Sequence, residues 1–133
     1  MTTPLFSLGT VVATPGVNDL VQSGGYGDSR PLSRLLKRHL CGDWAGRATD
    51  PTMYGSVGML DDHDLEVNRS ALVGGGRILT VWEATGPWVG LPPRKTAEGV
   101  EIRQNGDRID TITIWIITEA DRSATTFLLP SEY

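Results

Sequence analysis

The sequence predicts an α+β domain in which about three helices pack on one face of a small, mainly antiparallel sheet with a C-terminal β-meander. Helical spacing of apolar residues is confined to the segment before Gly74. The segment after Gly74 instead shows the alternation and the β-branched composition of strands. The length of 133 residues suits one domain that spans residues 1–133.

The first elements are a short strand and a helix. Alternation and β-branched residues predict a strand around Thr10–Val12. In the stretch "TPG" that follows, Thr14 suits the N-cap of a helix and Pro15 suits its first position. The glycine-rich stretch "SGGYGDSR" is expected to end this helix.

Two further helices are expected before the meander. The second starts near Pro31 and ends at Gly42, and its apolar stripe consists of Leu32, Leu35, Leu36, His39 and Leu40. The third starts at Asp61 or Asp62, where acidic side chains suit the helix dipole, and it stops at the glycines that begin with Gly74.

The second half of the chain is expected to form the sheet. The stretch "RILTVWE", residues 109–119 and residues 124–129 have strand character. Residues 45–60 and 84–108 are rich in turn-forming residues and are expected to be inserted loops. Within the second loop, an "NG" step favours an extra hairpin around "GVEIRQNGDRI".

Composition bounds the function. The chain has 12 basic and 16 acidic residues and a net charge of -4, which argues against a general nucleic-acid-binding protein. One short segment concentrates positive charge in Arg30, Arg34, Lys37 and Arg38. These residues form either a local basic patch, which keeps nucleic-acid binding open, or a solvated helix face, which we expect. No apolar run approaches the roughly 20 residues of a transmembrane helix, and the N-terminus does not resemble a signal peptide. We therefore expect a cytoplasmic protein without membrane contact.

Cofactor and metal motifs are missing from the sequence. It contains no Walker loop, GxGxxG, GxSxG or HExxH motif. Cys41 is the single cysteine, which rules out an intrachain disulfide and a zinc site built on several thiolates. The "DDHD" run at residues 61–64 cannot turn consecutive side chains toward one ion on a helix. Neither a cofactor nor a metal is expected.

The predicted hairpin "TITIWIITEADRSATTFLLP" holds most of the candidate site residues. Glu119 ends the first strand on the Trp115 side, and Arg122 follows across a tight turn. A Glu119–Arg122 pair is either part of a site or a surface ion pair. Asp121 and Thr125 join the group by position, although turn and strand propensity also explain them.

His39 allows two interpretations. On the apolar stripe it is either a hydrogen-bonded core residue or a catalytic group. Together with Glu119 and Arg122 it could cleave RNA, with two groups transferring protons and the arginine stabilising the phosphorane. The sequence leaves open whether the three side chains converge.

Three other polar or aromatic residues stand out near helix ends and faces. Asp43 and Trp44 follow the second helix, where they suit a C-cap and a loop anchor. Asn68 lies on an apolar helix face, where a buried amide needs hydrogen-bond partners. We expect Asn68 to fix a loop.

Several stretches together resemble a group of short bacterial proteins of unknown function, the plasmid-related proteins. The stretches are "HLCGDW", "NRSAL", "RILTVWE" and "IWIITEADRSATTFLLPSEY", of which "WIITEADRS" with "TTFLLP" is the most specific. The residues of this sequence that match the family pattern are His39, Gly42, Asp43, Trp44, Asn68, Trp115, Glu119, Asp121, Arg122 and Thr125. It implies shorter connections in the family, so that residues 45–60 and 84–108 look like additions. It implies a mobile genetic element and no established activity.

Three functional hypotheses follow. The first is an interaction protein of a mobile genetic element, such as an anti-CRISPR-like anti-defence inhibitor that binds a host or defence-system protein. The second is a small ribonuclease similar to RelE or barnase, which uses His39, Glu119 and Arg122. The third is a binder of a nucleotide-derived small molecule, with an apolar pocket near Trp115 or Trp82. The expected binding residues are Asp43, Trp44, Asn68, Trp115, Glu119, Asp121, Arg122 and Thr125.

Overall fold

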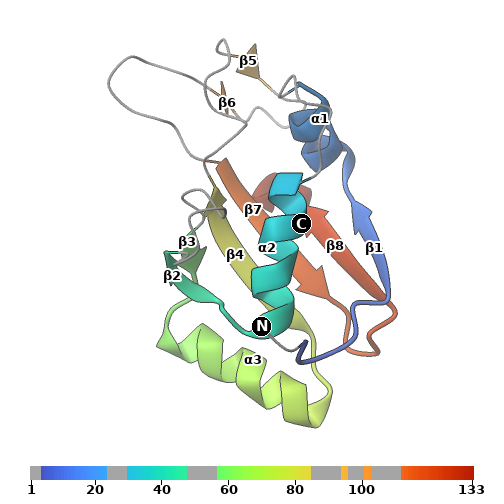
Figure 1. The fold of residues 1–133 in the computed structure, drawn as a ribbon, viewed down its shortest axis with the longest axis vertical. Helices are drawn as coiled ribbons and strands as arrows, with labels where there is room; N and C mark the ends of the chain where they lie inside the picture. Colours follow the sequence, from blue (N-terminus) through green and yellow to red (C-terminus); the bar gives the residue numbers. More distant parts are fainter. Residues whose placement is uncertain (1–3, 24–29, 48–56, 85–93, 96–100, 103–111) are drawn as a thin grey trace.

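The computed structural model describes residues 4–23, 30–47, 57–84, 94–95, 101–102 and 112–133, and it has the predicted α+β fold (Figure 1). The helices are α1 (Pro15–Ser23), α2 (Arg30–Cys41) and α3 (Asp62–Gly74). The strands are β1 (Thr10–Ala13), β2 (Ala45–Arg47), β3 (Val57–Met59), β4 (Ile78–Ala84), β5 (Arg94–Lys95), β6 (Glu101–Ile102), β7 (Ile112–Thr118) and β8 (Ala124–Leu128). A 3₁₀ turn, η2 (Pro130–Glu132), follows the last strand.

Six strands of the described residues form one mixed sheet in the order β1-β8-β7-β4-β3-β2. The predicted meander is its centre, because β7 pairs antiparallel with both β4 and β8. Only β1, which pairs with β8, runs parallel to its neighbour. The pairing in this sheet is thus mainly antiparallel. Together with the three helices, it confirms the predicted α+β fold class.

Both segments expected to be loops contribute strands. β2 and β3 lie within residues 45–60 and extend the sheet beyond β4. Each is three residues long and contains a glycine, so neither shows the alternation by which strands are recognised. Within residues 84–108, β5 pairs antiparallel with β6. Both strands precede the turn that was expected at residues 105–106. That turn lies outside the described residues.

The helices cover one face of the sheet, and α2 crosses it near the centre (Figure 1). Ile114 and Ile116 of β7 both point to this face, because side chains two residues apart in a strand share a face. They belong to a core cluster that also contains Val17, Leu32, Leu35, Trp82, Phe127 and Leu129. A second cluster joins α3 to the same layer through Trp44, Leu60, Ala71 and Ile78. On the other face of β7, Ile117 is also buried, as expected for a central strand.

The cap of α1 comes from the far end of the chain, which corrects the predicted role of the Thr14 side chain. Its hydroxyl donates a hydrogen bond to the carboxylate of Glu132. The same carboxylate accepts a hydrogen bond of 3.0 Å from the Gly16 N–H, one of the amides left open at the start of the helix. Pro15 is the first helical residue, as predicted. Glu132 therefore anchors the C-terminal turn to α1.

Both ends of α3 have local signals. The Asp61 side chain accepts a hydrogen bond of 2.8 Å from the Asp64 N–H, so Asp61 is the N-cap. At the other end Gly75 adopts φ 82°, and its N–H donates to the Ala71 carbonyl. The predicted limits of this helix are therefore confirmed.

Asn68 fixes α3 against the edge of the sheet, although it holds a strand rather than the expected loop. Its amide nitrogen donates to the Leu79 carbonyl at 2.8 Å, and its amide oxygen accepts from the Leu79 N–H at 3.2 Å. β3 pairs with β4 only from Trp82 onward, so Asn68 replaces a strand partner at Leu79. Asn68, with 2 % of its surface exposed, satisfies two partly buried backbone groups of Leu79 that β3 does not reach.

Replacing Asn68 by leucine is expected to lower the free energy of unfolding by about 2–4 kcal/mol, because both Leu79 groups lose their partners. Urea denaturation measures this change. Arg69→Ala is the matched control, since Arg69 lies next to it on α3 with a 60 % exposed side chain. We expect the control to change stability by less than about 0.5 kcal/mol. Equal effects of the two substitutions would contradict the role given to Asn68.

Candidate functional site

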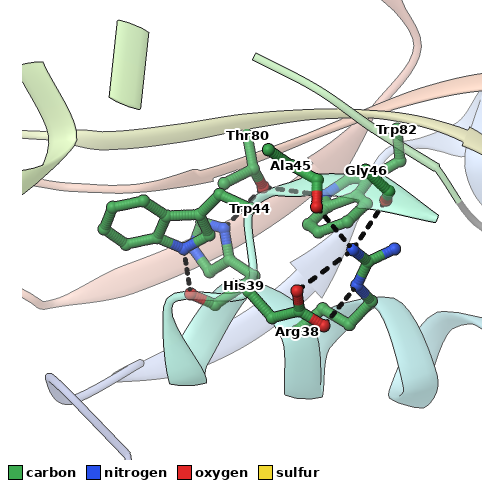
Figure 2. Close-up of polar contacts among 8 residues, drawn as sticks. Arg38, His39, Trp44, Ala45, Gly46, Thr80 and Trp82 are labelled. Atoms are coloured by element: carbon green, nitrogen blue, oxygen red, sulfur yellow. Dashed lines mark hydrogen bonds and ion pairs between the residues drawn. The ribbon is translucent and has the colours of Figure 1, made fainter. Parts of the chain in front are cut away.

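The residues singled out by the sequence fall into a buried network around His39, several contacts that fix turns and helix ends, and a cluster on the opposite face of the sheet. His39 lies in the last turn of α2 and has no exposed surface. Its Nδ1 is 2.6 Å from Thr80 Oγ1 of β4, and its Nε2 is 2.9 Å from Thr118 Oγ1 of β7. Figure 2 shows the imidazole with its contact to Thr80. Both ring nitrogens are thus engaged inside the protein.

The direction of these hydrogen bonds follows from the far end of the network. The Thr125 hydroxyl has one proton and donates it to the Leu8 carbonyl at 2.7 Å. In its 2.8 Å contact with Thr118, Thr125 must therefore accept. Thr118 has then used its own proton, so it accepts from His39 Nε2. The network thus requires a proton on Nε2.

The other side of the ring agrees with this assignment. With its proton on Nε2, neutral His39 accepts at Nδ1 from the Thr80 hydroxyl. The Thr80 oxygen in turn accepts from Trp82 Nε1–H at 2.7 Å. Every donor in the chain from the indole to the Leu8 carbonyl has one acceptor. A single neutral tautomer therefore satisfies the whole network.

Burial favours the same neutral state. Desolvation lowers the pKa of His39 from 6.5 to about 3. A protonated ring would also donate at Nδ1, which would displace the Thr80 proton from its acceptor. Because His39 is enclosed and both of its nitrogens are bonded, the geometry gives it a structural role.

The N-terminal segment reaches this network through Gly9. Gly9 adopts φ 64°, a conformation that side chains rarely tolerate. A Cβ at this position would lie 2.4 Å from the Ser123 backbone, so only glycine fits beside the turn between β7 and β8. This close approach brings the Leu8 carbonyl to Thr125.

Arg38 is buried, which corrects its predicted place on a solvated helix face. Its side chain has 1 % exposed surface, and its guanidinium carbon lies 4.7 Å from the centroid of the Trp82 ring. Its Nε donates to Asp43 at 2.9 Å, and Nη2 donates to the Ala45 and Gly46 carbonyls at 3.2 and 2.8 Å (Figure 2). Arg38 therefore ties the end of α2 to β2.

Asp43 and Trp44 belong to the same junction. The Asp43 carboxylate is the ion-pair partner of Arg38, and its N–H donates to the Arg38 carbonyl at 3.0 Å. Trp44 is buried, and its indole N–H donates to the His39 carbonyl at 2.7 Å (Figure 2). Both residues thus fix the exit from α2, as a C-cap and a loop anchor should.

The predicted ion pair between Glu119 and Arg122 does not form. The Arg122 guanidinium instead donates to three carbonyl oxygens, which are Gly76 O at 2.7 Å, Glu119 O at 3.0 Å and Ala71 O at 3.1 Å. Ala71 lies in the last turn of α3, and its carbonyl also accepts hydrogen bonds from the N–H groups of Gly75 and Gly76. Arg122, which has φ 61°, thus connects the turn after β7 to the end of α3.

Asp121 shapes that turn. Its carboxylate accepts a hydrogen bond of 2.9 Å from the Ser123 N–H, an arrangement typical of turns that contain aspartate. Hydrogen bonds from the Ser123 side chain and backbone lower the pKa of Asp121. The role found for Asp121 is therefore local.

His39, Glu119 and Arg122 do not converge on one pocket. Thr118 points to His39 on the helix side of the sheet, so Glu119, the next residue, points to the other side. Arg122 and His39 each contact the Phe6 ring, at 5.5 and 5.4 Å from its centroid, and no hydrogen bond joins these two side chains. Their hydrogen-bonding atoms face carbonyls and hydroxyls of the fold itself.

Four side chains on the opposite face form a second group, which we call the aromatic–arginine cluster: Arg77, Trp115, Glu119 and Tyr133. The Trp115 and Tyr133 rings lie 5.3 Å apart, and Arg77 donates to the Tyr133 hydroxyl at 3.1 Å. Arg77 also pairs with Glu119 at 3.3 Å. Tyr133 is 70 % exposed and the Arg77 side chain 47 %, so the cluster is accessible to a partner.

The sequence analysis did not single out two members of this cluster, Arg77 and Tyr133. Ile78 pairs with Thr118 in the sheet, which places Arg77 opposite Glu119. The register of β4 on β7 is the signal that would have linked these residues. Three other expected binding residues, Trp44, Asn68 and Thr125, are buried within the fold.

Among the described residues, no group of three His, Cys, Asp or Glu side chains is arranged to hold a metal ion. In that same part of the chain, no helix combines the length and apolar character needed to cross a membrane.

Comparisons with known proteins add no family to this picture. The chain matches no protein-family model, and searches of curated proteins and of solved structures give no match either. The resemblance to the plasmid-related proteins therefore stays a prediction.

The buried state of His39 predicts a pH-dependent stability. Between pH 6.5 and about 3 the unfolded chain binds a proton at this residue that the folded chain does not bind. The free energy of unfolding should therefore be highest above pH 6.5 and fall with falling pH, by about 1.4 kcal/mol per pH unit from this group. Urea denaturation from pH 7 to pH 4 measures the slope.

His39→Gln is the reference for this measurement, because glutamine can form hydrogen bonds but does not titrate. The other ionisable groups are shared by both proteins, so the difference in slope isolates His39. Parallel pH profiles for the wild type and the variant would contradict a buried, neutral His39.

Proposed function

We propose that the protein is a small cytoplasmic interaction protein that binds a protein partner through the aromatic–arginine cluster. The observation that carries this proposal is the exposed Tyr133, packed on Trp115 and hydrogen-bonded to Arg77. Tryptophan, tyrosine and arginine are the residues most enriched among those that dominate binding energy at protein interfaces. Contacts within the cluster hold the side chains in place before binding, which reduces the entropy lost on association.

The described polar groups favour binding over catalysis. The two ring nitrogens of His39 and the guanidinium of Arg122 are occupied by structural hydrogen bonds. A ribonuclease that used these residues with Glu119 would need them around one substrate phosphate. That alternative therefore has less support than an interaction protein.

The nucleotide-derived ligand also has less support. Trp82 is completely buried, with its indole nitrogen bonded to Thr80. Trp115 packs against Tyr133. Neither ring lines the 320 Å³ groove beside β1.

The nature of the partner is proposed from the sequence. The resemblance to plasmid-related proteins favours a mobile genetic element, and such elements benefit from proteins that inhibit host defence. We therefore propose an anti-defence role, similar to that of an anti-CRISPR protein, with a component of a host defence complex as the partner.

The proposal is tested by capturing partners from a bacterial lysate and measuring the affinity of the purified complex. A double substitution, Arg77→Ala with Tyr133→Ala, is expected to weaken binding at least about 30-fold, which corresponds to loss of roughly 2 kcal/mol. Because both side chains are largely exposed, the fold should persist, which circular dichroism checks.

Arg69→Ala, on the exposed side of α3, serves as the control and should bind as the wild type does. Two results would count against the proposal: no stoichiometric protein partner, or a partner that binds the double variant with unchanged affinity. Uniform RNA fragments that disappear in a Glu119→Ala, Arg122→Ala variant would favour the ribonuclease.

A further inference from the structure

β1 is an edge strand of the six-stranded sheet that the described residues form (Figure 1). The Thr10 N–H donates to Ser123 O and the Thr14 N–H to Phe127 O, both at 3.0 Å. Since backbone groups alternate along a strand, the N–H groups of Val11 and Ala13 point away from β8. In the part of the chain that the structure describes, no strand pairs with this outer side.

An apolar groove adjoins this open edge. It has a volume of 320 Å³ and is lined by Val11, Val12, Ala13, Asn18, Leu32, Ser33, Leu36 and Phe127. Val11 is 43 % and Val12 45 % exposed, although exposed sheet edges are usually protected by charge, proline or a bulge. The stretch "TVVA" contains none of the protective residues. Edge and groove together offer backbone hydrogen bonds beside a pocket for a side chain.

The charge around the groove selects among possible occupants. The groove side of α2 includes Ser33, and Lys37 lies one turn further along the same helix face. Lys37 is exposed, and the sequence of α2, "RPLSRLLKRHLC", has no acidic residue. A second copy would present the same helix sequence, which has no acidic residue to pair with Lys37. An extended segment with an acidic residue would instead be attracted.

We propose that the open edge of β1 and its groove bind an extended peptide segment of a partner protein by strand addition. Main-chain hydrogen bonds to Val11 and Ala13 hold the segment, an apolar side chain enters the groove, and an acidic side chain lies near Lys37. This surface is separate from the aromatic–arginine cluster, and the proposal does not depend on that cluster.

A library of random linear nonapeptides displayed on phage tests this site with many candidate segments at once. The full chain is the bait, and Val11→Lys, which places a charge at the groove, is the counter-selection. We expect enriched peptides to alternate apolar residues, to carry an acidic residue, and to lose at least about 10-fold in affinity for Val11→Lys. Shifts of the Val11 and Ala13 amide resonances should accompany binding.

Two controls distinguish strand addition from nonspecific binding of apolar peptides. Two versions of an enriched peptide are compared, one methylated at its odd-numbered backbone nitrogens and the other at its even-numbered ones. One version should lose binding and the other should keep it, because only one set of N–H groups faces β1. Lys37→Glu should reverse the preference, so that a peptide with lysine in place of its acidic residue binds better. Val11→Lys must keep the wild-type circular dichroism spectrum, and Lys37→Glu provides a second variant at an exposed position.

The proposal is overturned if no peptide is enriched, or if enriched peptides bind Val11→Lys and Lys37→Glu as they bind the wild type. It is also overturned if sedimentation shows a dimer that Val11→Lys dissociates, since a second copy then occupies the edge. Substitutions of Arg77 and Tyr133 should leave peptide affinity unchanged, so failure here is distinguishable from failure of the aromatic–arginine cluster.

Discussion

The hydrogen-bond chain through His39 is the interaction on which the arrangement of helices and sheet depends. It runs from the Trp82 indole through Thr80, His39, Thr118 and Thr125 to the carbonyl of Leu8. It thereby joins α2, three strands and the N-terminal segment. Because each hydroxyl supplies only one proton, reversing one bond would leave a donor unpaired elsewhere in the chain. The network therefore specifies one docking of α2 on the sheet.

This constraint bears on function, since it uses residues that could otherwise perform chemistry. Arg38 and Arg122 extend the pattern: each guanidinium binds backbone carbonyls and fixes a helix end. Charged groups placed in this way are costly to leave unpaired, so they hold local structure firmly. What remains for a partner is the outer surface, where Tyr133 with Arg77 and the open edge of β1 offer two different kinds of contact.

Local signals account for the elements that the sequence predicted. The leucine spacing of α2, the Asp61 cap and the β-branched run of β7 each act within a few residues. Long-range contacts decide the rest. β2 and β3 are too short to show a period, and their pairing depends on β4. Arg38 looked like one cation among several, because Trp82 and Asp43 become its neighbours only after folding. The predicted Glu119–Arg122 pair failed for the same reason.

The protonation state of the His39 ring tests the central claim most directly. Long-range ¹⁵N–¹H correlation spectra of the histidine side chain report which ring nitrogen carries the proton. The hydrogen-bond chain predicts a single neutral tautomer, with the proton on Nε2, that persists from pH 7 to pH 4. A proton on Nδ1, an average of two tautomers, or an imidazolium near pH 6 would contradict the assigned network and return His39 to the candidates for catalysis.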